Sequence, residues 1–373
     1  MYSGKPAGLI ASTKDWLEAL HGKDRVGSYY REFHHDDVTK LADSKGIDGQ
    51  VPEHFRAGTF RGHPSFAALL RNARVWEKNG AVITPDNKLL GDVSRDYDKG
   101  MLHGERHPAF HRWHRPPLRR IREPSALLTY IWSGNYFHWL FDVLPRVSLL
   151  RDSGWNIRKY IVPRDNRKIQ AETLNMMGIS KKMRIESGHS FHARFDKLIV
   201  PSFVKKEREL PSEYPRWAAE FLRNEFLLKR AVPLSYEYER IFISRANAWQ
   251  RKLLNERDVL DAIRDYGFRV VELEKLTFKE QVRIFASAKV ILASHGAGLA
   301  NLVFSRPGAK VIEMFPPSYV PNYFWHLSNQ MGLDHYYLIG ERSVKPHPGG
   351  WEGSDDFEVD AGKLKELLRF AQI

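Results

Sequence analysis

The sequence contains no cysteine, which excludes disulfide bonds and metal sites built on thiolate ligands. Long apolar runs are also missing, and none approaches the roughly 20 residues of a membrane-spanning helix. The first 20 residues lack the apolar core of a secretory signal. From these absences we expect a cytoplasmic protein that lies, at most, on the inner face of a membrane.

Several chemical signatures are absent as well. There is no G-x-S-x-G nucleophile elbow, no G-x-x-x-x-G-K-[ST] phosphate loop and no H-E-x-x-H zinc site. The D-x-D pair Asp96 and Asp98 stands in a polar stretch between Arg95 and Lys99, with no buried strand before it. We therefore expect a loop at this pair, no metal and no bound cofactor.

Positive charge, by contrast, is abundant. The 373 residues carry a formal net charge of +13, and 42% are hydrophobic, enough for two packed domains. Basic proteins attract nucleic acid, anionic membranes or phosphorylated substrates. Much of the excess lies in residues 107–124 (HPAFHRWHRPPLRRIREP). This basic segment is either a solvated surface connection or a patch for a polyanionic acceptor or a lipid phosphate.

The N-terminal half predicts a mixed α/β architecture. Residues 1–75 show only short helices, such as 12–20, and no motif. Partial alternation of apolar and polar residues over 73–93, with turns at Asn79-Gly80 and Asp86-Asn87, predicts a small β-meander. Beyond Ala126, strands and helices alternate, which predicts a parallel layer: strands 127–132, 159–163 and 195–202, and helices 135–152 and 169–178.

The C-terminal half has a clearer pattern, and we place the domain junction near Pro233. Strands and helices alternate through a doubly wound βαβαβ unit: strands 239–245, 268–274, 289–298 and 310–317, and helices 255–267, 277–288 and 299–308. We therefore expect an N-terminal domain at 1–232, a ligand-binding domain at 233–360 and a closing helix at 361–373.

The strongest single motif is VILASHGAGLANLVF, at 290–304. A buried strand ends at His295, and Gly296, Ala297 and Gly298 form the turn into a helix. Small residues let an anion approach the backbone, where free N–H groups and the positive helix end attract it. Asn301 stands where a dinucleotide fingerprint has its third glycine, so a nicotinamide-binding site fits less well.

Two more strand ends carry polar groups that suit a nucleotide. Ser244 and Arg245 close the first strand of the second half, and Arg251 follows in the same loop. Guanidinium groups bind phosphate with two parallel hydrogen bonds, and such loops lie where open α/β sheets bind ligands. Glu313 follows in the strand after the glycine turn; it could accept both ribose hydroxyls, pair with Lys310 or cap a helix.

A polar stripe is predicted on the helix at 135–152. Asn135, His138, Asp142 and Arg146 fall on one face at offsets of three and four. A histidine and an aspartate one turn apart can act as a base and its orienting carboxylate. A histidine on such a helix is often structural, but four polar groups on one stripe favour a functional role.

Taken together, three segments resemble glycosyltransferase family 61: residues 135–146 (NYFHWLFDVLPR), 243–256 (ISRANAWQRKLLNE) and 272–317 (beginning ELEKLTF and ending EMFPP). They follow one another in the family's order across Ala126 to Pro317, and the first 75 residues are not covered. Eukaryotic members include the EGF-domain O-linked N-acetylglucosamine transferase and plant xylan-decorating transferases. Bacterial members are associated with capsular or surface polysaccharide synthesis.

The resemblance implies a GT-B architecture, with two Rossmann-like domains facing a cleft, and inverting transfer without an essential metal. Ser244, Arg245, Arg251, His295, Gly296, Ala297, Gly298 and Glu313 would bind the nucleotide-sugar donor, expected to be a UDP-sugar. Asn135, His138 and Asp142 would lie on the acceptor side, facing a glycan or lipid-linked glycan. Either His138, oriented by Asp142, or Asp142 itself would be the base.

Two other functions remain open. The net charge of +13 also suits a non-catalytic protein that binds polyanions, although nucleic acid is not the expected partner. The partial glycine fingerprint leaves room for a nicotinamide-dependent oxidoreductase. Both are weaker expectations than the transferase, because neither requires the three ordered segments.

Overall fold

The computed structural model describes residues 4–47, 49, 51–98, 100–112, 116–164, 167–205, 214–344 and 352–373. The chain forms two compact units: unit 1 is Met1–Asp37 with Gly62–Lys206, and unit 2 is Val38–Arg61 with Glu207–Ile373. This division differs from the expected junction near Pro233. Helix α5 (Arg216–Phe226) packs within unit 2, where Arg223 donates to the backbone carbonyl of Val303 at 3.1 Å.

Unit 1 contains two six-stranded sheets. The first has the order β14-β13-β12-β16-β5-β2. Its strands are β14 (Arg184–Ser187), β13 (Lys159–Pro163), β12 (Ser125–Leu127), β16 (Lys197–Pro201), β5 (Ser65–Arg71) and β2 (Tyr30–Phe33). The first four are parallel to one another, β5 is antiparallel to β16, and β2 is antiparallel to β5. The bounds of the strand expected at 127–132 are wrong, because β12 ends at Leu127 and overlaps the prediction only there.

The second sheet of unit 1 contains the predicted β-meander. Strands β6 (Arg74–Trp76), β7 (Ala81–Ile83) and β8 (Lys88–Leu90) are antiparallel, which confirms the meander. It is not an isolated unit, since β1 (Gly8–Ile10), β15 (His192–Phe195) and β11 (Arg119–Ile121) complete the sheet. Side chains of both sheets share one apolar core, in which Val82 of this sheet and Leu198 of the other are fully buried.

In the described residues of unit 1, four α-helices accompany these sheets: α1 (Thr13–His21), α2 (Tyr136–His138), α3 (Arg146–Asp152) and α4 (Lys168–Met176). Helix α1 confirms the expectation for residues 12–20 and begins where the Ser12 side chain accepts from the Asp15 amide. The predicted helix at 135–152 is interrupted, because a π-helical turn, Trp139–Val143, joins α2 to Pro145 and α3.

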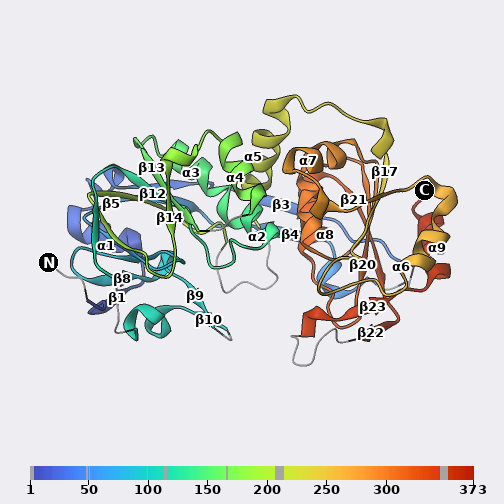
Figure 1. Ribbon diagram of the computed structural model, residues 1–373, viewed down its shortest axis with the longest axis horizontal. Coiled ribbons are helices and arrows are strands. Elements are labelled where there is room, and N and C mark those ends of the chain that lie inside the picture. Colours follow the sequence, from blue (N-terminus) through green and yellow to red (C-terminus); the bar gives the residue numbers. More distant parts are fainter. Residues whose placement is uncertain are drawn as a thin grey trace. The chain divides into compact units, whose positions relative to one another are not determined.

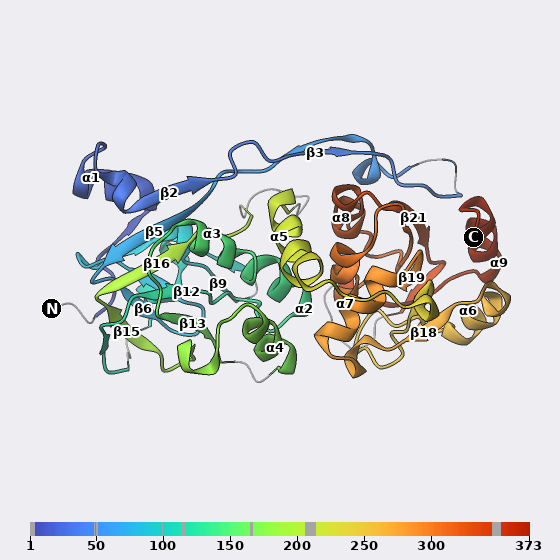
Figure 2. The ribbon, with the colours of Figure 1, turned by 90° about the horizontal axis from the view of Figure 1, so that it is seen from above.

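The core of unit 2 is a five-stranded sheet with the order β18-β17-β19-β20-β21, parallel throughout. Its strands are β17 (Arg240–Ile243), β18 (Arg269–Val271), β19 (Val290–Ser294), β20 (Lys310–Phe315) and β21 (Asp334–Ile339). The first four confirm the predicted βαβαβ pattern. Figures 1 and 2 show α6 (Glu256–Ala262) and α9 (Ala361–Phe370) on one face and α7 (Phe278–Ser287) and α8 (Tyr323–Met331) on the other. The unit is therefore doubly wound.

One helix of unit 2 differs in type from the prediction. Residues 297–304 form a 3-10 helix that starts directly after Gly296. Helix α7 begins with a reciprocal cap, in which Thr277 accepts from the Glu280 amide and Glu280 accepts from the Thr277 amide. The closing helix expected at 361–373 is confirmed as α9, which packs beside α6.

Residues 38–61 join unit 2 although they lie far from it in sequence. Strands β3 (Val38–Leu41) and β4 (Gly58–Arg61) pair as a hairpin, and β3 runs beside α8 (Figure 2). The backbone of Lys45 exchanges hydrogen bonds with that of His335 and Tyr337, each at 3.0 Å. A second hairpin, β22 (Arg342–Val344) with β23 (Asp356–Glu358), lies near the end of the chain.

Candidate functional site

Two polar segments of unit 2 meet at one edge of its sheet. Ser244 follows β17, and His295 follows β19, and these strands are parallel neighbours. The strand order reverses between them, because the chain first adds β18 on one side of β17 and then β19 on the other. The carboxyl edge at such a reversal is where open α/β sheets bind ligands. The structure thus brings the predicted segments together at this edge.

Arg245 lies directly against Gly296. A Cβ atom added to Gly296 would be only 2.1 Å from Nη1 of Arg245 and 2.8 Å from its Cζ. The guanidinium is held by the backbone, since Nε donates to the carbonyl of Arg251 at 3.2 Å and Nη2 to that of Gln250 at 2.8 Å. Burial lowers the pKa of Arg245 to about 10, and the nearby charge of Arg251 adds to this effect. Gly296 is therefore required by close approach to a fixed cation.

Arg251 provides a second guanidinium near the same turn. Its backbone has a positive φ of 51°, and its Nη1 donates to the carbonyl of Gly353 at 2.7 Å. The guanidinium carbon is 5.7 Å from the centre of the Tyr319 ring. Burial lowers its pKa, an effect that Tyr319 and Tyr323 partly oppose. A guanidinium remains charged at neutral pH, so this edge of the sheet carries two cations.

His295 belongs to a buried hydrogen-bonded chain of four residues. Its Nδ1 lies 2.6 Å from Oε1 of Glu313, and Oε2 of Glu313 is 2.9 Å from Nε2 of His335. The Nδ1 atom of His335 is in turn 2.7 Å from the Ser44 hydroxyl. Glu313 is fully buried, with one imidazole on each oxygen. Glu313 therefore orients His295. The two imidazoles occupy the oxygens that a ribose contact would need, and Lys310 donates to the carbonyl of Ala371 and not to Glu313.

Burial also determines the protonation of the residues in this hydrogen-bonded series. It lowers the pKa of His295 well below its usual range, and the cations Arg251 and Arg245 lower it further. Burial lowers the pKa of His335 to about 3 and raises that of Glu313 well above its usual range. Both imidazoles are therefore neutral at pH 7. A neutral ring bonded through Nδ1 keeps Nε2 as its second hydrogen-bonding atom.

The other predicted donor residues, Ser244, Ala297 and Gly298, make contacts that stabilise the fold. The Ser244 hydroxyl donates to Oε1 of Glu256 at 2.6 Å, which ties β17 to the start of α6. Ala297 and Gly298 open the 3-10 helix, and a Cβ on Gly298 would be 2.6 Å from Cδ1 of Leu273. The close contact at Gly298 is thus with an apolar side chain, whereas that at Gly296 is with a cation.

In unit 1 the structure confirms the predicted pairing of His138 with Asp142. His138 Nδ1 lies 2.7 Å from Oδ2 of Asp142, one turn later. The His138 side chain is 22% exposed and that of Asp142 only 1%. Asn135 is not part of this contact, because its Oδ1 accepts from the amides of Phe137 and His138 and caps α2.

Arg146 completes the predicted stripe as a buried anchor. Its Nη1 donates to the carbonyl of Thr129 at 2.9 Å and its Nη2 to that of Pro201 at 3.2 Å. Burial lowers its pKa to about 10, and the carboxylate of Asp142 opposes this lowering. Arg146 therefore ties the interrupted helix to the segments that follow β12 and end β16.

Sequence reasoning missed three members of the unit 2 site: His335, Tyr319 and Ser44. His335 stands in β21 and Ser44 in the 38–61 segment, and neither belongs to a motif that links it to His295. Tyr319 follows the predicted strand at 310–317, and no motif or apolar periodicity marks it in the sequence. Only the sheet register, which pairs Val311 with His335, brings the second histidine beside Glu313.

The D-x-D pair is more ordered than expected. Asp96 lies in a short strand, β9 (Asp96–Tyr97), which pairs with β10 (Met101–Leu102). It is buried, and its Oδ1 accepts from Nδ2 of Asn79 at 2.7 Å.

The described part of the chain contains no group of three or more His, Asp or Glu side chains placed to hold a metal ion. The same residues contain no helix long and apolar enough to cross a membrane.

A buried histidine of α8 predicts a pH dependence of stability. His326 is 2% exposed, and its Nε2 has no hydrogen-bond partner in the described part of the chain. Burial lowers its pKa to about 4. An unfolded histidine titrates near 6.5, so between these values the unfolded state binds more protons, and stability falls as the pH falls.

For this residue alone we expect a loss of about 2 kcal/mol between pH 7 and pH 5. The variant His326→Phe should keep the edge-on packing against Phe60 and lose that part of the pH dependence. Urea unfolding of both proteins at the two pH values measures the difference. An unchanged pH dependence in the variant would contradict the assignment.

The comparisons with known proteins agree with the arrangement of these segments. The family model described as Glycosyltransferase 61 matches residues 136–312. The human protein O-linked-mannose beta-1,4-N-acetylglucosaminyltransferase 2 is 28% identical over 153 residues, which cover 38% of this chain and 26% of that protein. Its Bos taurus counterpart is 29% identical over 170 residues, covering 42% and 29%. A beta-1,2-xylosyltransferase of Oryza sativa subsp. japonica is 30% identical over 95 residues, covering 23% and 18%.

The matched segment thus spans roughly a quarter of the length of the mammalian relatives. Within this chain, the segment that the family model matches begins one residue after Asn135 and ends one residue before Glu313, so it contains both the His138–Asp142 pair and the His295 turn. On this match, and on the three ordered segments, residues 136–312 form a segment of the glycosyltransferase 61 family.

Proposed function

We propose that this protein is an inverting glycosyltransferase that moves a sugar from a nucleotide-sugar donor to a glycan acceptor without a metal ion. The observation that carries the proposal is the pair of fixed cations, Arg245 and Arg251, beside the glycine turn at the strand-order reversal of unit 2. The family match over 136–312 and the names of the similar proteins given above, which are sugar transferases, support it. A UDP-sugar is the proposed donor.

In this proposal unit 2 binds the donor diphosphate. When the bond between the sugar C1 and the diphosphate breaks, negative charge develops on the leaving oxygen. Preorganised cations and dipoles stabilise such charge strongly, because they need no rearrangement during the reaction. Arg245, Arg251 and the Gly296–Gly298 turn supply them, and neutral His295, oriented by Glu313, supplies a hydrogen bond.

Unit 1 supplies the base. Nδ1 of His138 is engaged by Asp142, so Nε2 is the nitrogen that would take the proton from the acceptor hydroxyl. The freed oxygen attacks C1 of the sugar from the side opposite the leaving diphosphate, which inverts the configuration there. Asp142 orients the ring and stabilises its charged form. We propose the GT-B arrangement, in which the two units face one cleft.

The biological setting follows from the family resemblance and the charge. We propose a role in capsular or surface polysaccharide synthesis on the cytoplasmic side of a membrane. Part of the basic segment is exposed in the structure, including Arg112, Arg119 and Arg120, whereas Trp113 and Arg115 lie outside the described residues. Exposed arginines would favour contact with an anionic membrane surface.

Binding experiments separate this proposal from its rivals. The purified protein is titrated with UDP, GDP, CMP and NAD in separate calorimetric runs at two salt concentrations. A transferase binds one nucleoside diphosphate or monophosphate selectively. Selective binding of NAD would favour an oxidoreductase, and binding of every anion with a steep loss at high salt would favour a polyanion-binding protein.

Metal independence gives a further prediction. Two guanidinium groups at the diphosphate site take the place of a divalent cation, so sugar transfer should continue at an undiminished rate in EDTA. Turnover is measured in chelator and then with added Mg²⁺ or Mn²⁺. A full loss of activity that either ion restores would overturn this part of the proposal and direct attention to Asp96 and Asp98.

A further inference from the structure

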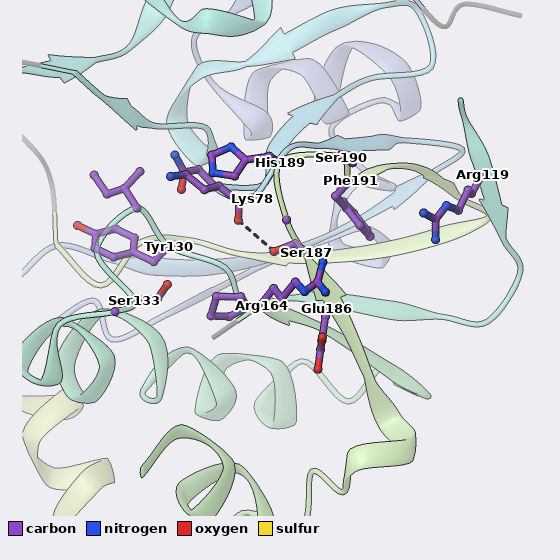
Figure 3. Close-up of a pocket in the computed structure, with 15 residues that line it drawn as sticks. Lys78, Arg119, Tyr130, Ser133, Arg164, Glu186, Ser187, His189, Ser190 and Phe191 are labelled. Atoms are coloured by element: carbon purple, nitrogen blue, oxygen red, sulfur yellow. Dashed lines mark hydrogen bonds between the residues drawn. The ribbon is translucent and has the colours of Figure 1, made fainter. Parts of the chain in front are cut away.

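A pocket opens at the carboxyl edge of the parallel sheet in unit 1. It has a volume of about 510 Å³, and its walls come from the segments that follow β12, β13 and β14 and from the turn after β6. Figure 3 shows Arg164 in the middle of the opening, Tyr130 and Ser133 on one side, and Phe191 and Arg119 on the other. The carboxyl ends of parallel strands are the usual ligand edge of an α/β sheet.

The lining carries more positive than negative charge. Lys78, Arg119 and Arg164 contribute cations, and Glu186 is the carboxylate among the lining residues. All four side chains are exposed, and none of the three cations forms an ion pair with a described residue. Three positive charges against one negative charge leave a surplus of two. A phosphate monoester carries about −1.5 to −2 charges at pH 7, so one such group balances this surplus better than a single carboxylate.

The remaining lining suits a sugar. Ser133, Ser190 and Asn79 place hydroxyl and amide groups around the opening, and such groups exchange hydrogen bonds with sugar hydroxyls. The aromatic residues Tyr130 and Phe191 also line the pocket and are themselves largely buried. Ser187 differs, because its hydroxyl donates to the carbonyl of Lys78 at 3.0 Å and fixes the turn that carries the lysine (Figure 3).

This pocket lies beside the proposed base. The ring of Tyr130, in the pocket wall, is 6.1 Å from the ring of His138 between centroids. Trp132, two residues later, is 4.9 Å from the same imidazole. A sugar held in the pocket would therefore be close to the group that would take its hydroxyl proton.

We infer that this pocket is the acceptor site and that the acceptor is a glycan carrying a phosphate group, bound by Lys78, Arg119 and Arg164. The inference rests on the proposed function, and it makes the acceptor anionic. The phosphate could belong to the glycan itself or join it to a lipid through a diphosphate. Arg119 belongs to the basic segment at 107–124, so this site also gives part of that segment a role.

Equilibrium binding to the full chain tests the inference. The probes are glucose 1-phosphate, the neutral methyl glucoside, and glucuronate as a carboxylate of similar size. We expect glucose 1-phosphate to bind at least tenfold more tightly than either of the other two. The double variant Lys78→Ala/Arg164→Ala should weaken its binding by at least tenfold, and Arg119→Ala should weaken it several-fold.

The matched control is Lys23→Ala/Arg25→Ala, which removes the same two residue types from exposed positions of unit 1 outside the pocket. It should change the affinity less than twofold, and the melting temperatures should show that all variants fold. Wild-type affinity in the pocket variants, equal affinity for the methyl glucoside, or tighter binding of glucuronate would each overturn the inference. A farnesyl-diphosphate-linked glucose that binds more tightly than glucose 1-phosphate would assign the phosphate to a lipid carrier, and equal affinities would assign it to the glycan.

Measuring donor binding as well distinguishes a failure of the acceptor inference from a failure of the proposed function. Nucleotide affinity is measured on the same variants and should not change, because the pocket residues belong to unit 1 and the donor turn to unit 2. If the pocket variants bind donor normally but keep their affinity for glucose 1-phosphate, only the acceptor inference fails. If the wild-type protein binds no nucleotide, the proposed function itself fails.

Discussion

The variant His138→Ala should transfer sugar at least about a hundredfold more slowly than the wild type, with an unchanged affinity for the donor. A positioned general base contributes on the order of a hundredfold to ten-thousandfold to the rate. His138 is held for this role by the 2.7 Å contact of its Nδ1 with Asp142. Donor affinity should not respond, because the proposed diphosphate site lies in the other unit. Turnover, donor affinity and melting temperature are measured on the same protein.

Asp142→Asn tests the orienting carboxylate in the same way. The amide cannot stabilise the charged imidazole as a carboxylate does, so turnover should again fall steeply. The side chain is buried beside Arg146, so some loss of stability is expected too. Asp152→Asn, at an exposed position on α3, is the matched control and should leave turnover unchanged.

The outcomes separate chemistry from structure. Normal turnover in both His138→Ala and Asp142→Asn would exclude a catalytic role for the pair. A fall in activity that follows the fall in melting temperature would show that the two residues only hold the interrupted helix in place. Loss of turnover in a protein that is folded and binds donor is the expected result.

The variant Gly296→Ala should weaken donor binding by about tenfold to a hundredfold. The new methyl group would lie 2.1 Å from Nη1 of Arg245, far inside contact distance. Two backbone carbonyls hold this guanidinium, so it cannot move aside without breaking those bonds. A hydrogen bond to a charged group contributes about 1.5–3 kcal/mol, which corresponds to roughly this range of affinity.

Gly298→Ala is the matched control in the same turn. Its methyl group would meet Cδ1 of Leu273, the flexible end of an apolar side chain, which can rotate away at small cost. We expect a loss of donor affinity of less than about threefold. Isothermal titration with the nucleotide that the wild type selects compares both variants. Wild-type affinity in Gly296→Ala would remove Arg245 from the donor site, and equal losses in both variants would show that the turn excludes any side chain.

Local patterns predicted most of the architecture around the site. The alternation of apolar strands and amphipathic helices from Arg240 to Phe315 appears in the structure with its elements in the predicted order. The π-helical turn at 139–143 was not predicted, because apolar periodicity cannot distinguish one extra residue in a turn from a regular helix. The 3-10 helix after Gly296 was missed for a similar reason.

Local sequence patterns did not predict the role of Glu313. The sequence left three roles open for it, a contact with ribose hydroxyls, a pair with Lys310 or a helix cap, but His335, from a strand that was not predicted, occupies one of its oxygens. Asn135 was misjudged for a different, local reason: it fits the polar stripe by spacing, but its side chain caps the helix. Side-chain partners from distant segments depend on sheet register, and a single sequence does not display register between non-adjacent strands.

Residue types and their spacing along the chain were enough to predict the α/β class, the two arginines and the glycine turn at the carboxyl edge of the unit 2 sheet, and the His138–Asp142 pair. All of these depend on contacts within one turn of helix or at the end of a strand. The tertiary structure alone decided that 38–61 packs with the C-terminal residues, that His335 joins His295 through Glu313, and that Lys78, Arg119 and Arg164 line one pocket. These groupings join residues far apart in sequence, and only the packing of sheets and the reversal of strand order brings such residues together.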